Sequence, residues 1–392
     1  MDSACRTLLS VLIGALCWAS DAGAVIVSAP LGLFVATADM PQATYNHTAT
    51  LLADGRVLLT ASAQSELFDP VLGTFTATGA MANAHDVATA IRLNDGRVLV
   101  TGTSFPAPYP ASEVFDPASD AFGLTGDMVV RRYGASSVLL PDGRALIVGG
   151  ESPSQSNVPL QTAELFDPSA GSFQATGVEI SPRIGATTTV LQNGDVLVAG
   201  GTDGAGHVYA TAEIYRFATG AFSMTGSMGF YRVYHAASLL PDGDVLVSGG
   251  YGSTTGAAVG NSTGVVQACV ELFHPSSGTF SQVTAVMTTT RQNHSSTIQK
   301  DGSVLLAGGQ DDYGNTLPYA DVYNPSTQQF TRVIARMNVA RTAHAATALA
   351  DGRTLITGGQ IYLPGNTQFV PTAAAEFFEP DDIFTAAFDV AP

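Results

Sequence analysis

Residues 47–60 read HTATLLADGRVLLT, in which an Asp54-Gly55 pair separates two apolar runs. Asp-Gly between two such runs predicts a β-hairpin, because a tight two-residue turn needs positive φ angles, which glycine adopts without strain. A third run at 66–68 ends at Asp69-Pro70, and a fourth occupies 75–78. Proline cannot donate to a strand ladder, so it marks a strand end. This stretch therefore predicts four short antiparallel strands.

The same unit recurs seven times along the chain. Its Asp/Asn-Gly pairs are spaced 41–59 residues apart, which is the period of a repeat architecture. The second run ends in Gly-Gly in five units, an aromatic residue stands in the third run of every unit, and a Phe stands in the fourth. The pairs begin at Asp54, Asp95, Asp142, Asn193, Asp242, Asp301 and Asp351.

The Gly-Gly pair and the two aromatic positions resemble the kelch repeat family over essentially the whole chain after residue 24. The resemblance implies an all-β fold, namely a seven-bladed β-propeller with four antiparallel strands per blade. The WD40 alternative is disfavoured because the sequence has no Trp-Asp pair.

Two terminal segments copy the fourth strand of the unit and compete to close the ring. Gly32 to Met40 shares the Gly, Phe, Ala, Thr and Met of the segment from Gly73 to Met81 in the same spacing, whereas the tail 383–385 is a looser copy. We expect residues 32–40 to pair with the last blade, and the tail is the alternative. Residues 25–392 then form one propeller domain.

Residues 1–24 have the features of a secretory signal peptide. Arg6 precedes an apolar stretch at 8–18, which is too short to span a bilayer, and an Ala-Gly-Ala site follows at 22–24. We therefore expect a secreted or periplasmic protein that does not span the membrane.

The chain is acidic, with a net charge of −17 that becomes −16 once residues 1–24 are removed. It contains a single lysine, Lys300, and no basic run, so nucleic-acid binding is not expected. We expect a monomer without a cofactor.

The loops between second and third strands vary in length and share one face with the entrance to the innermost strands. Variable loops on a rigid scaffold are where binding sites tend to lie. Two patterns recur around this face. One is Arg-x-x-His, and the other is an acidic residue at the start of each third strand. Converging imidazoles could hold a metal, but residues that recur in blade after blade favour a structural ring in which Arg pairs with the acids. The ring comprises Arg132, Arg183, Arg232, Arg291, Arg341, His47, His294 and His344.

Residues that interrupt or decorate this repeat are the candidates for function. They stand at or just before the innermost strands, where neighbouring blades come closest, and they combine flat aromatic faces with polar tips. This chemistry suits a sugar or a peptide side chain. The candidate ligand-binding residues are His85, Asp86, Tyr133, Tyr234 and His235.

Residues 230–243, FYRVYHAASLLPDG, resemble the galactose oxidase family. The resemblance implies a copper site in which Tyr234 and His235 match a ligand pair, while Tyr133 loosely matches a second tyrosine. The family also has a cysteine near the position of His85, whereas this chain continues Val87-Ala88-Thr89.

Two functions follow from the sequence. The first is a non-catalytic binding or scaffold module for an extracellular protein or glycan, with no metal and no catalytic residues. The alternative is an enzyme at the channel mouth, either a galactose oxidase-like copper oxidase or a sugar-modifying, epimerase-like enzyme. No nucleophilic triad, phosphate loop or zinc-ligand spacing is present to favour another chemistry.

Overall fold

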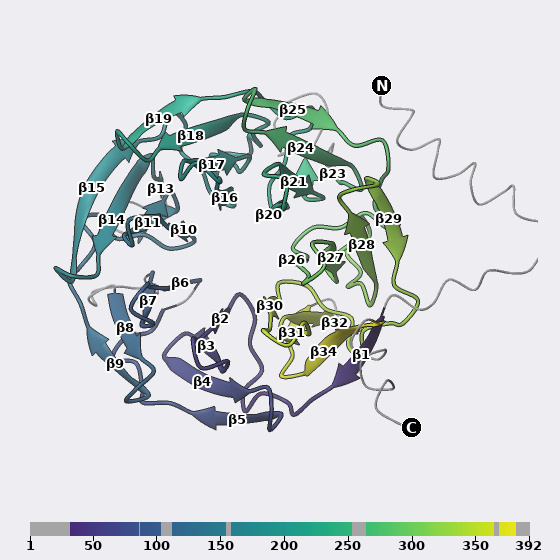
Figure 1. The fold of residues 1–392 in the computed structure, drawn as a ribbon, viewed down its shortest axis with the longest axis horizontal. Helices are drawn as coiled ribbons and strands as arrows, with labels where there is room; N and C mark the ends of the chain where they lie inside the picture. The colour runs from purple at the N-terminus through teal and green to yellow at the C-terminus, as the bar shows by residue number, and fades with distance from the viewer. Residues whose placement is uncertain are drawn as a thin grey trace, which may run out of the picture.

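The computed structural model describes residues 32–85, 87–102, 112–153, 158–252, 264–363 and 368–381. Its regular structure is built of strands, which form seven four-stranded antiparallel sheets arranged around a central axis (Figure 1). The predicted seven-bladed all-β propeller is therefore confirmed. No helix in these ranges is long and apolar enough to cross a bilayer. The proposed signal peptide lies outside them.

Each blade runs from an inner strand to an outer strand, and we number the blades 1 to 7 by their inner strands. The inner strands are β2 (Thr48–Leu51), β6 (Thr89–Arg92), β10 (Ser136–Leu139), β16 (Thr187–Val190), β20 (Ala236–Leu239), β26 (Ser295–Ile298) and β30 (Ala345–Ala348). The second strands are β3 (Val57–Ala61), β7 (Val98–Thr101), β11 (Ala145–Val148), β17 (Val196–Ala199), β21 (Val245–Ser248), β27 (Val304–Ala307) and β31 (Thr354–Thr357).

The two remaining positions of each blade complete the sheets. The third strands are β4 (Gln64–Asp69), β8 (Ser112–Asp116), β14 (Thr162–Asp167), β18 (Ala212–Arg216), β24 (Val270–His274), β28 (Ala320–Asn324) and β34 (Ala375–Pro380). The outer strands are β5 (Thr74–Ala77), β9 (Ala121–Leu124), β15 (Ser172–Val178), β19 (Ala221–Met224), β25 (Thr279–Gln282), β29 (Gln329–Arg332) and β1 (Gly32–Ala36).

The Asp-Gly hairpins join inner to second strands, as the sequence predicted, but their turns are one residue longer. Leu52 pairs with Arg56 across three residues, and the Gly55 amide donates to the Leu52 carbonyl. Only Gly55 has a positive φ, of 91°. This is the geometry of a type I turn followed by a glycine bulge rather than of a two-residue turn.

The N-terminal strand β1 closes the ring. It is the outer strand of blade 7 and pairs antiparallel with β34, with Phe34 opposite Phe378. The two rings lie 5.2 Å apart. In the other six blades the corresponding aromatic pair, between third and outer strands, lies 4.7–5.1 Å apart. Residues 32–40, which copy the fourth strand of the repeat, thus place Phe34 at the aromatic position of the outer strand. The alternative closing segment, the tail 383–385, lies outside the described residues.

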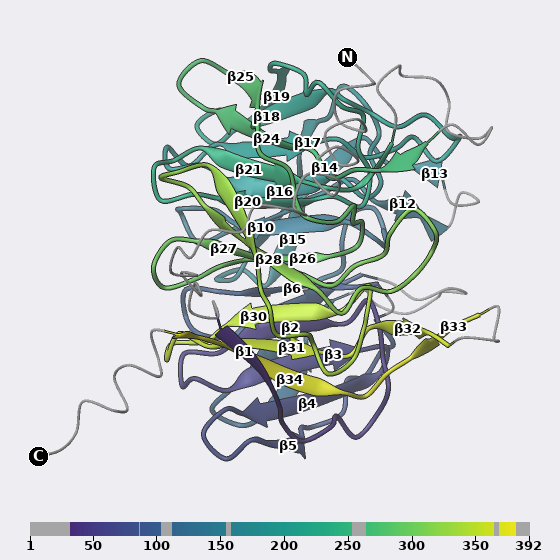
Figure 2. The same ribbon diagram turned by 90° about the vertical axis from the view of Figure 1, so that its right-hand side faces the viewer.

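Three short hairpins extend the loops between second and third strands on one face (Figure 2). Since the Asp-Gly turns lie at the opposite ends of the same strands, this is the variable face predicted from loop lengths. The hairpins are β12 (Glu151–Ser152) with β13 (Val158–Pro159), β22 (Tyr251–Gly252) with β23 (Val265–Val266), and β32 (Gln360–Tyr362) with β33 (Phe369–Pro371).

Candidate binding site at the mouth of the channel

Five buried arginines anchor the blades just below the channel mouth. In blade 5, Arg232 donates to Glu271 at 2.9 Å and to the carbonyls of Gly249 and Cys269 at 2.7 and 3.0 Å. A buried guanidinium needs such partners, because taking an unpaired charge out of water is costly. The predicted pairing of Arg with the third-strand acids is seen in Arg132–Glu164, Arg183–Glu213, Arg232–Glu271, Arg291–Asp321 and Arg341–Glu376, at 2.7–2.9 Å.

The four recurring histidines belong to the same framework. His294 packs against Gly249 of the preceding blade so closely that a Cβ there would lie 2.8 Å from its Cε1, which explains the first glycine of the Gly-Gly pair. Burial lowers the pKa of His235 and of His344 to about 3, and that of His47 to about 4. These imidazoles are therefore neutral spacers between blades.

His85 stands in the place of the arginine in blade 2. Its Nε2 lies 3.2 Å from Glu113, its Nδ1 lies 2.7 Å from the Gly102 carbonyl oxygen, and the side chain is buried. The structure therefore places this candidate in the framework, with both ring nitrogens already bonded. Asp86, the candidate beside it, lies outside the described residues.

Seven residues with a left-handed backbone conformation form a ring around the channel mouth. Each blade contributes one of them, just before its inner strand. Their φ angles are 48–65°, a conformation that glycine and asparagine tolerate better than branched or bulky side chains. Backbone amides join neighbours in the ring; for example, the Asn293 amide donates to the Tyr234 carbonyl at 3.0 Å. The ring residues are Asn46, Val87, Gly134, Gly185, Tyr234, Asn293 and Ala343.

The ring is open over blades 3 to 5. Among the described residues, the amides of Gly185 and Tyr234 have no hydrogen-bond acceptor, and neither does that of Val87 in blade 2. The other four ring amides donate to the neighbouring blade. Tyr234 is 47% exposed, and its ring lies over Gly185, whose Cβ position would lie 3.4 Å from the tyrosine Cε1. An aromatic face and two free donors therefore meet at this part of the mouth.

Tyr133 lies beside the same opening, next to Gly134. Its hydroxyl donates to Glu151 of the β12–β13 hairpin. Burial and the Glu151 carboxylate together raise the pKa of Tyr133 to about 12, so the phenol stays protonated. Of the five predicted site residues, Tyr133 and Tyr234 thus flank the opening, and His235 lies buried beneath it.

A buried carboxylate under this opening escaped the sequence analysis. Fourteen residues before the turn Asp/Asn, six blades carry a buried methionine, whereas blade 4 carries Glu179. Each of six inter-blade core clusters contains its methionine, and the cluster between blades 3 and 4 contains none. Reading down this one repeat position would have found Glu179. The methionines are Met40, Met81, Met128, Met228, Met287 and Met337.

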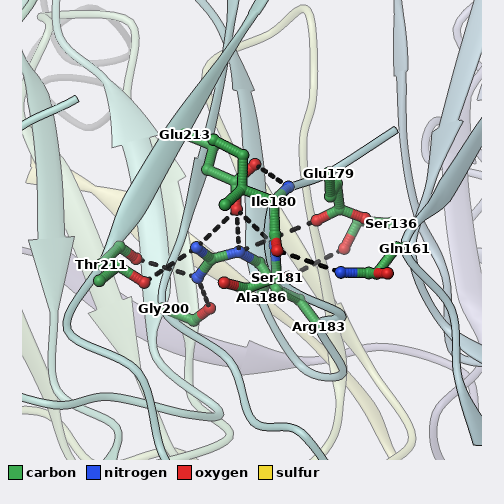
Figure 3. A network of polar contacts seen from close by, with 10 residues as sticks. All are labelled: Ser136, Gln161, Glu179, Ile180, Ser181, Arg183, Ala186, Gly200, Thr211 and Glu213. Atoms are coloured by element: carbon green, nitrogen blue, oxygen red, sulfur yellow. Dashed lines mark hydrogen bonds and ion pairs between the residues drawn. The ribbon is translucent and has the colours of Figure 1, made fainter. Parts of the chain in front are cut away.

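Glu179 is 2% exposed, and neither carboxylate oxygen has a hydrogen-bond partner within the described ranges. Its nearest charge is Arg183, whose Nε lies 3.8 Å away but whose guanidinium is hydrogen-bonded to Glu213 (Figure 3). Burial raises the pKa of Glu179 to about 9, and the arginine only partly opposes this effect. The carboxyl group is therefore protonated at neutral pH.

A small cavity lies beneath the mouth, between Glu179 and the ring glycines. It is lined by Glu179, Ser136, Gly149 and the two ring glycines, Gly134 and Gly185. Blade 4 has Ala186 where four other blades have the spacer histidine, so the space beside Gly149 is left open. About 10 Å³ is open to the centres of water molecules, which is room for one water-sized group.

We expect Glu179→Met to remove a pH-dependent loss of stability. The folded-state pKa lies above the unfolded value, so the contribution of Glu179 is fully present below about pH 4.5 and is lost as the pH rises towards 9. Relative to wild type, Glu179→Met should gain up to about 1.4 kcal/mol per pH unit across this window in urea unfolding. Glu179→Gln is the matched polar control and should lose the same pH dependence. Parallel stability profiles for all three proteins would contradict the assignment.

Comparisons with known proteins support the fold. No protein-family model matches the sequence, and a search of curated proteins finds no match. Among solved structures, the chain is similar to a fungal alcohol oxidase of the AA5 family in complex with copper, with a TM-score of 0.71 and 18% sequence identity. The match covers 89% of this chain and 76% of that one. At this identity the likeness shows a shared propeller architecture.

The described residues do not provide a fitting copper site at Tyr234 and His235. His235 is enclosed between blades, and its Nε2 lies 3.0 Å from the Thr187 hydroxyl, much as His344 contacts Ser295. No group of three or more His, Cys, Asp or Glu side chains suited to a metal ion occurs in the described part of the chain. His235 thus occupies the recurring histidine position of the repeat, and Tyr234 is the one tyrosine among the seven ring residues.

Proposed function

We propose that this protein is an exported, non-catalytic propeller that binds a glycan at the channel mouth over blades 3 to 5. One observation carries the proposal: a buried carboxylate without a hydrogen-bond partner among the described residues, a small cavity and an exposed tyrosine lie together at one place. Glu179 replaces the methionine of six blades, Ala186 leaves open the histidine position that is also alanine in blades 2 and 3, and the ring beside them has Gly185 and Tyr234. Blade architecture does not account for Glu179 or Tyr234, which no other blade has at these positions.

The chemistry of the opening suits a sugar ring. The exposed Tyr234 ring offers a flat apolar face, and the free amides of Gly185 and Tyr234 can donate to hydroxyl oxygens. The buried carboxyl group of Glu179 can accept a hydrogen bond from one hydroxyl that enters the cavity. A protein partner that inserts a polar side chain is the other occupant consistent with these groups.

We expect Tyr234→Asn to abolish or strongly weaken ligand binding while preserving the fold. Asparagine occupies the same ring position in blades 1 and 6, so the left-handed backbone is kept. A glycan array would identify a ligand of the mature protein, and calorimetry with that glycan would follow the variants. Losing the aromatic face should cost about 1–2 kcal/mol or more.

The matched control is Asn46→Ala, a ring substitution in blade 1, away from the opening; alanine occupies this position in blade 7. It should leave the affinity unchanged. Equal losses in both variants would mean that the ring as a whole, and not its opening, supports binding. An array without any hit, together with capture of a protein partner that Tyr234→Asn abolishes, would replace the glycan with a protein ligand.

An enzyme at the channel mouth is the second candidate. The propeller likeness to a copper alcohol oxidase favours it, and so does Glu179, because a carboxyl group protonated at neutral pH can act as a general acid. The copper form of this candidate needs ligands beyond those described. Metal analysis of the mature protein and assays for alcohol oxidation and sugar epimerisation separate it from a binding module.

A further inference from the structure

Blade 1 lacks the framework arginine that five other blades contain. Thr44 occupies the arginine position, ten residues before the turn Asp. Its backbone keeps the arginine's role, because the Gly359 amide donates to the Thr44 carbonyl just as the Gly309 amide donates to that of Arg341. Only the long cationic side chain is missing.

Blade 1 keeps residues at the acceptor positions of that side chain. In the five complete blades, the guanidinium donates to the carbonyl of the glycine that follows the second strand, to the carbonyl two residues before the acid, and to the acid itself. By sequence position, the corresponding groups of blade 1 are the carbonyls of Ala61 and Gln64 and the carboxylate of Glu66. Ala61 is the last residue of β3, whereas the glycines of the other blades follow the strand with a positive φ. A carbonyl paired in a sheet still has a second lone pair to offer.

Glu66 has no partner among the residues that the structure describes. Elsewhere, amides of the crossing segment also bind the acid, as the amides of Ile180 and Ser181 bind Glu213. In blade 1 the first of these positions is Pro41, which has no amide hydrogen, and no hydrogen bond or ion pair to the Glu66 carboxylate is found. Partial burial raises the pKa of Glu66.

A pocket of about 350 Å³ occupies the place of the missing side chain. It is lined by Thr44, Ala61, Gln64 and Glu66, with Met40 and His47 on its apolar side. Gln42, Ser62 and Gln64 at its edge are exposed, so the pocket opens to solvent. It therefore combines one unpaired carboxylate with carbonyl acceptors in a recess that another blade would fill with arginine.

We propose that this blade 1 pocket binds a guanidinium group, supplied by an arginine side chain of a partner protein. The guanidinium is planar and presents five donors in a fixed fork, which matches one carboxylate and two carbonyls better than the point charge of an ammonium group does. The acidic charge of the chain favours the approach of a cationic segment. This proposal is independent of the glycan site.

The probe is arginine amide, titrated into the mature protein and followed by NMR or calorimetry, with lysine amide and N-methylguanidinium as comparisons. Arginine amide and N-methylguanidinium should bind saturably and in competition with each other, and lysine amide should bind at least about tenfold more weakly. Binding of arginine amide alone would identify the source as an arginine residue with its backbone, whereas equal binding of lysine amide would overturn the proposal.

Three variants locate the site. Thr44→Arg should place a guanidinium in the pocket from within the chain, abolish probe binding and raise the melting temperature. Glu66→Gln should weaken binding by about tenfold or more, while Glu66→Asp should bind measurably, because blade 6 pairs its arginine with Asp321. Unchanged affinity in both Thr44→Arg and Glu66→Gln would overturn the assignment even if probe binding itself were real.

Discussion

Arg232→Met is expected to destabilise the propeller by about 3–5 kcal/mol, the range for removing one partner of a buried ion pair. The substitution leaves the Glu271 carboxylate buried and deprives the carbonyls of Gly249 and Cys269 of their shared donor. Hydrophobic contact with methionine does not replace these bonds. Urea unfolding at neutral pH, compared with wild type, measures the loss.

The double variant Arg232→Met/Glu271→Gln is the matched comparison. It removes the uncompensated charge, so it should recover part of the stability lost in the single variant. The Gly229 amide, which donates to Glu271, keeps an acceptor in the glutamine carbonyl. If Arg232→Met lowers the free energy of unfolding by less than about 1 kcal/mol, the Arg232–Glu271 pair contributes no more than a surface ion pair does. That result would contradict its assignment to the framework.

Removal of β1, by starting the chain at residue 37, is expected to lower the melting temperature by several degrees, at about 2–4 °C for each kcal/mol lost. The truncation exposes the edge of β34 along five paired residues and removes the Phe34 ring from Phe378. An open strand edge also invites pairing between molecules, so the truncated protein should aggregate at lower concentration.

Truncation of residues 382–392 is the natural comparison, because that tail was the alternative closing strand in the sequence. It should leave the melting temperature close to that of wild type. If instead the loss of β1 has no effect and the loss of the tail lowers the melting temperature, the ring closes through its C-terminus in solution.

The fold was accessible from the sequence because its evidence is repeated seven times. Any one Asp-Gly pair or third-strand aromatic is weak evidence, but seven copies in register leave little freedom for another architecture. The turn length was missed because a glycine bulge and a two-residue turn share the same Asp-Gly signature.

The candidate site was predictable only in part. Tyr133 and Tyr234 were singled out because they decorate a recognised repeat position, and they stay predictions. His85 was singled out as ligand-binding because it breaks the arginine pattern, and in the structure it contacts Glu113 in the arginine's place. Glu179 was missed because the methionine position is not among the Gly-Gly and aromatic positions that defined the repeat. Its burial and lack of partners depend on packing between blades, which no local pattern encodes.

The double variant Glu179→Met/Tyr234→Asn tests the central claim most directly, since it restores two repeat residues at the mouth without altering the framework. Its affinity for the glycan identified on the array is the quantity to measure, beside its melting temperature at neutral pH. We expect a variant at least as stable as wild type, because a buried carboxyl group is replaced by the methionine of six other blades. We also expect binding to be lost. Wild-type affinity in a folded double variant would contradict the account and would place the ligand site elsewhere on the propeller.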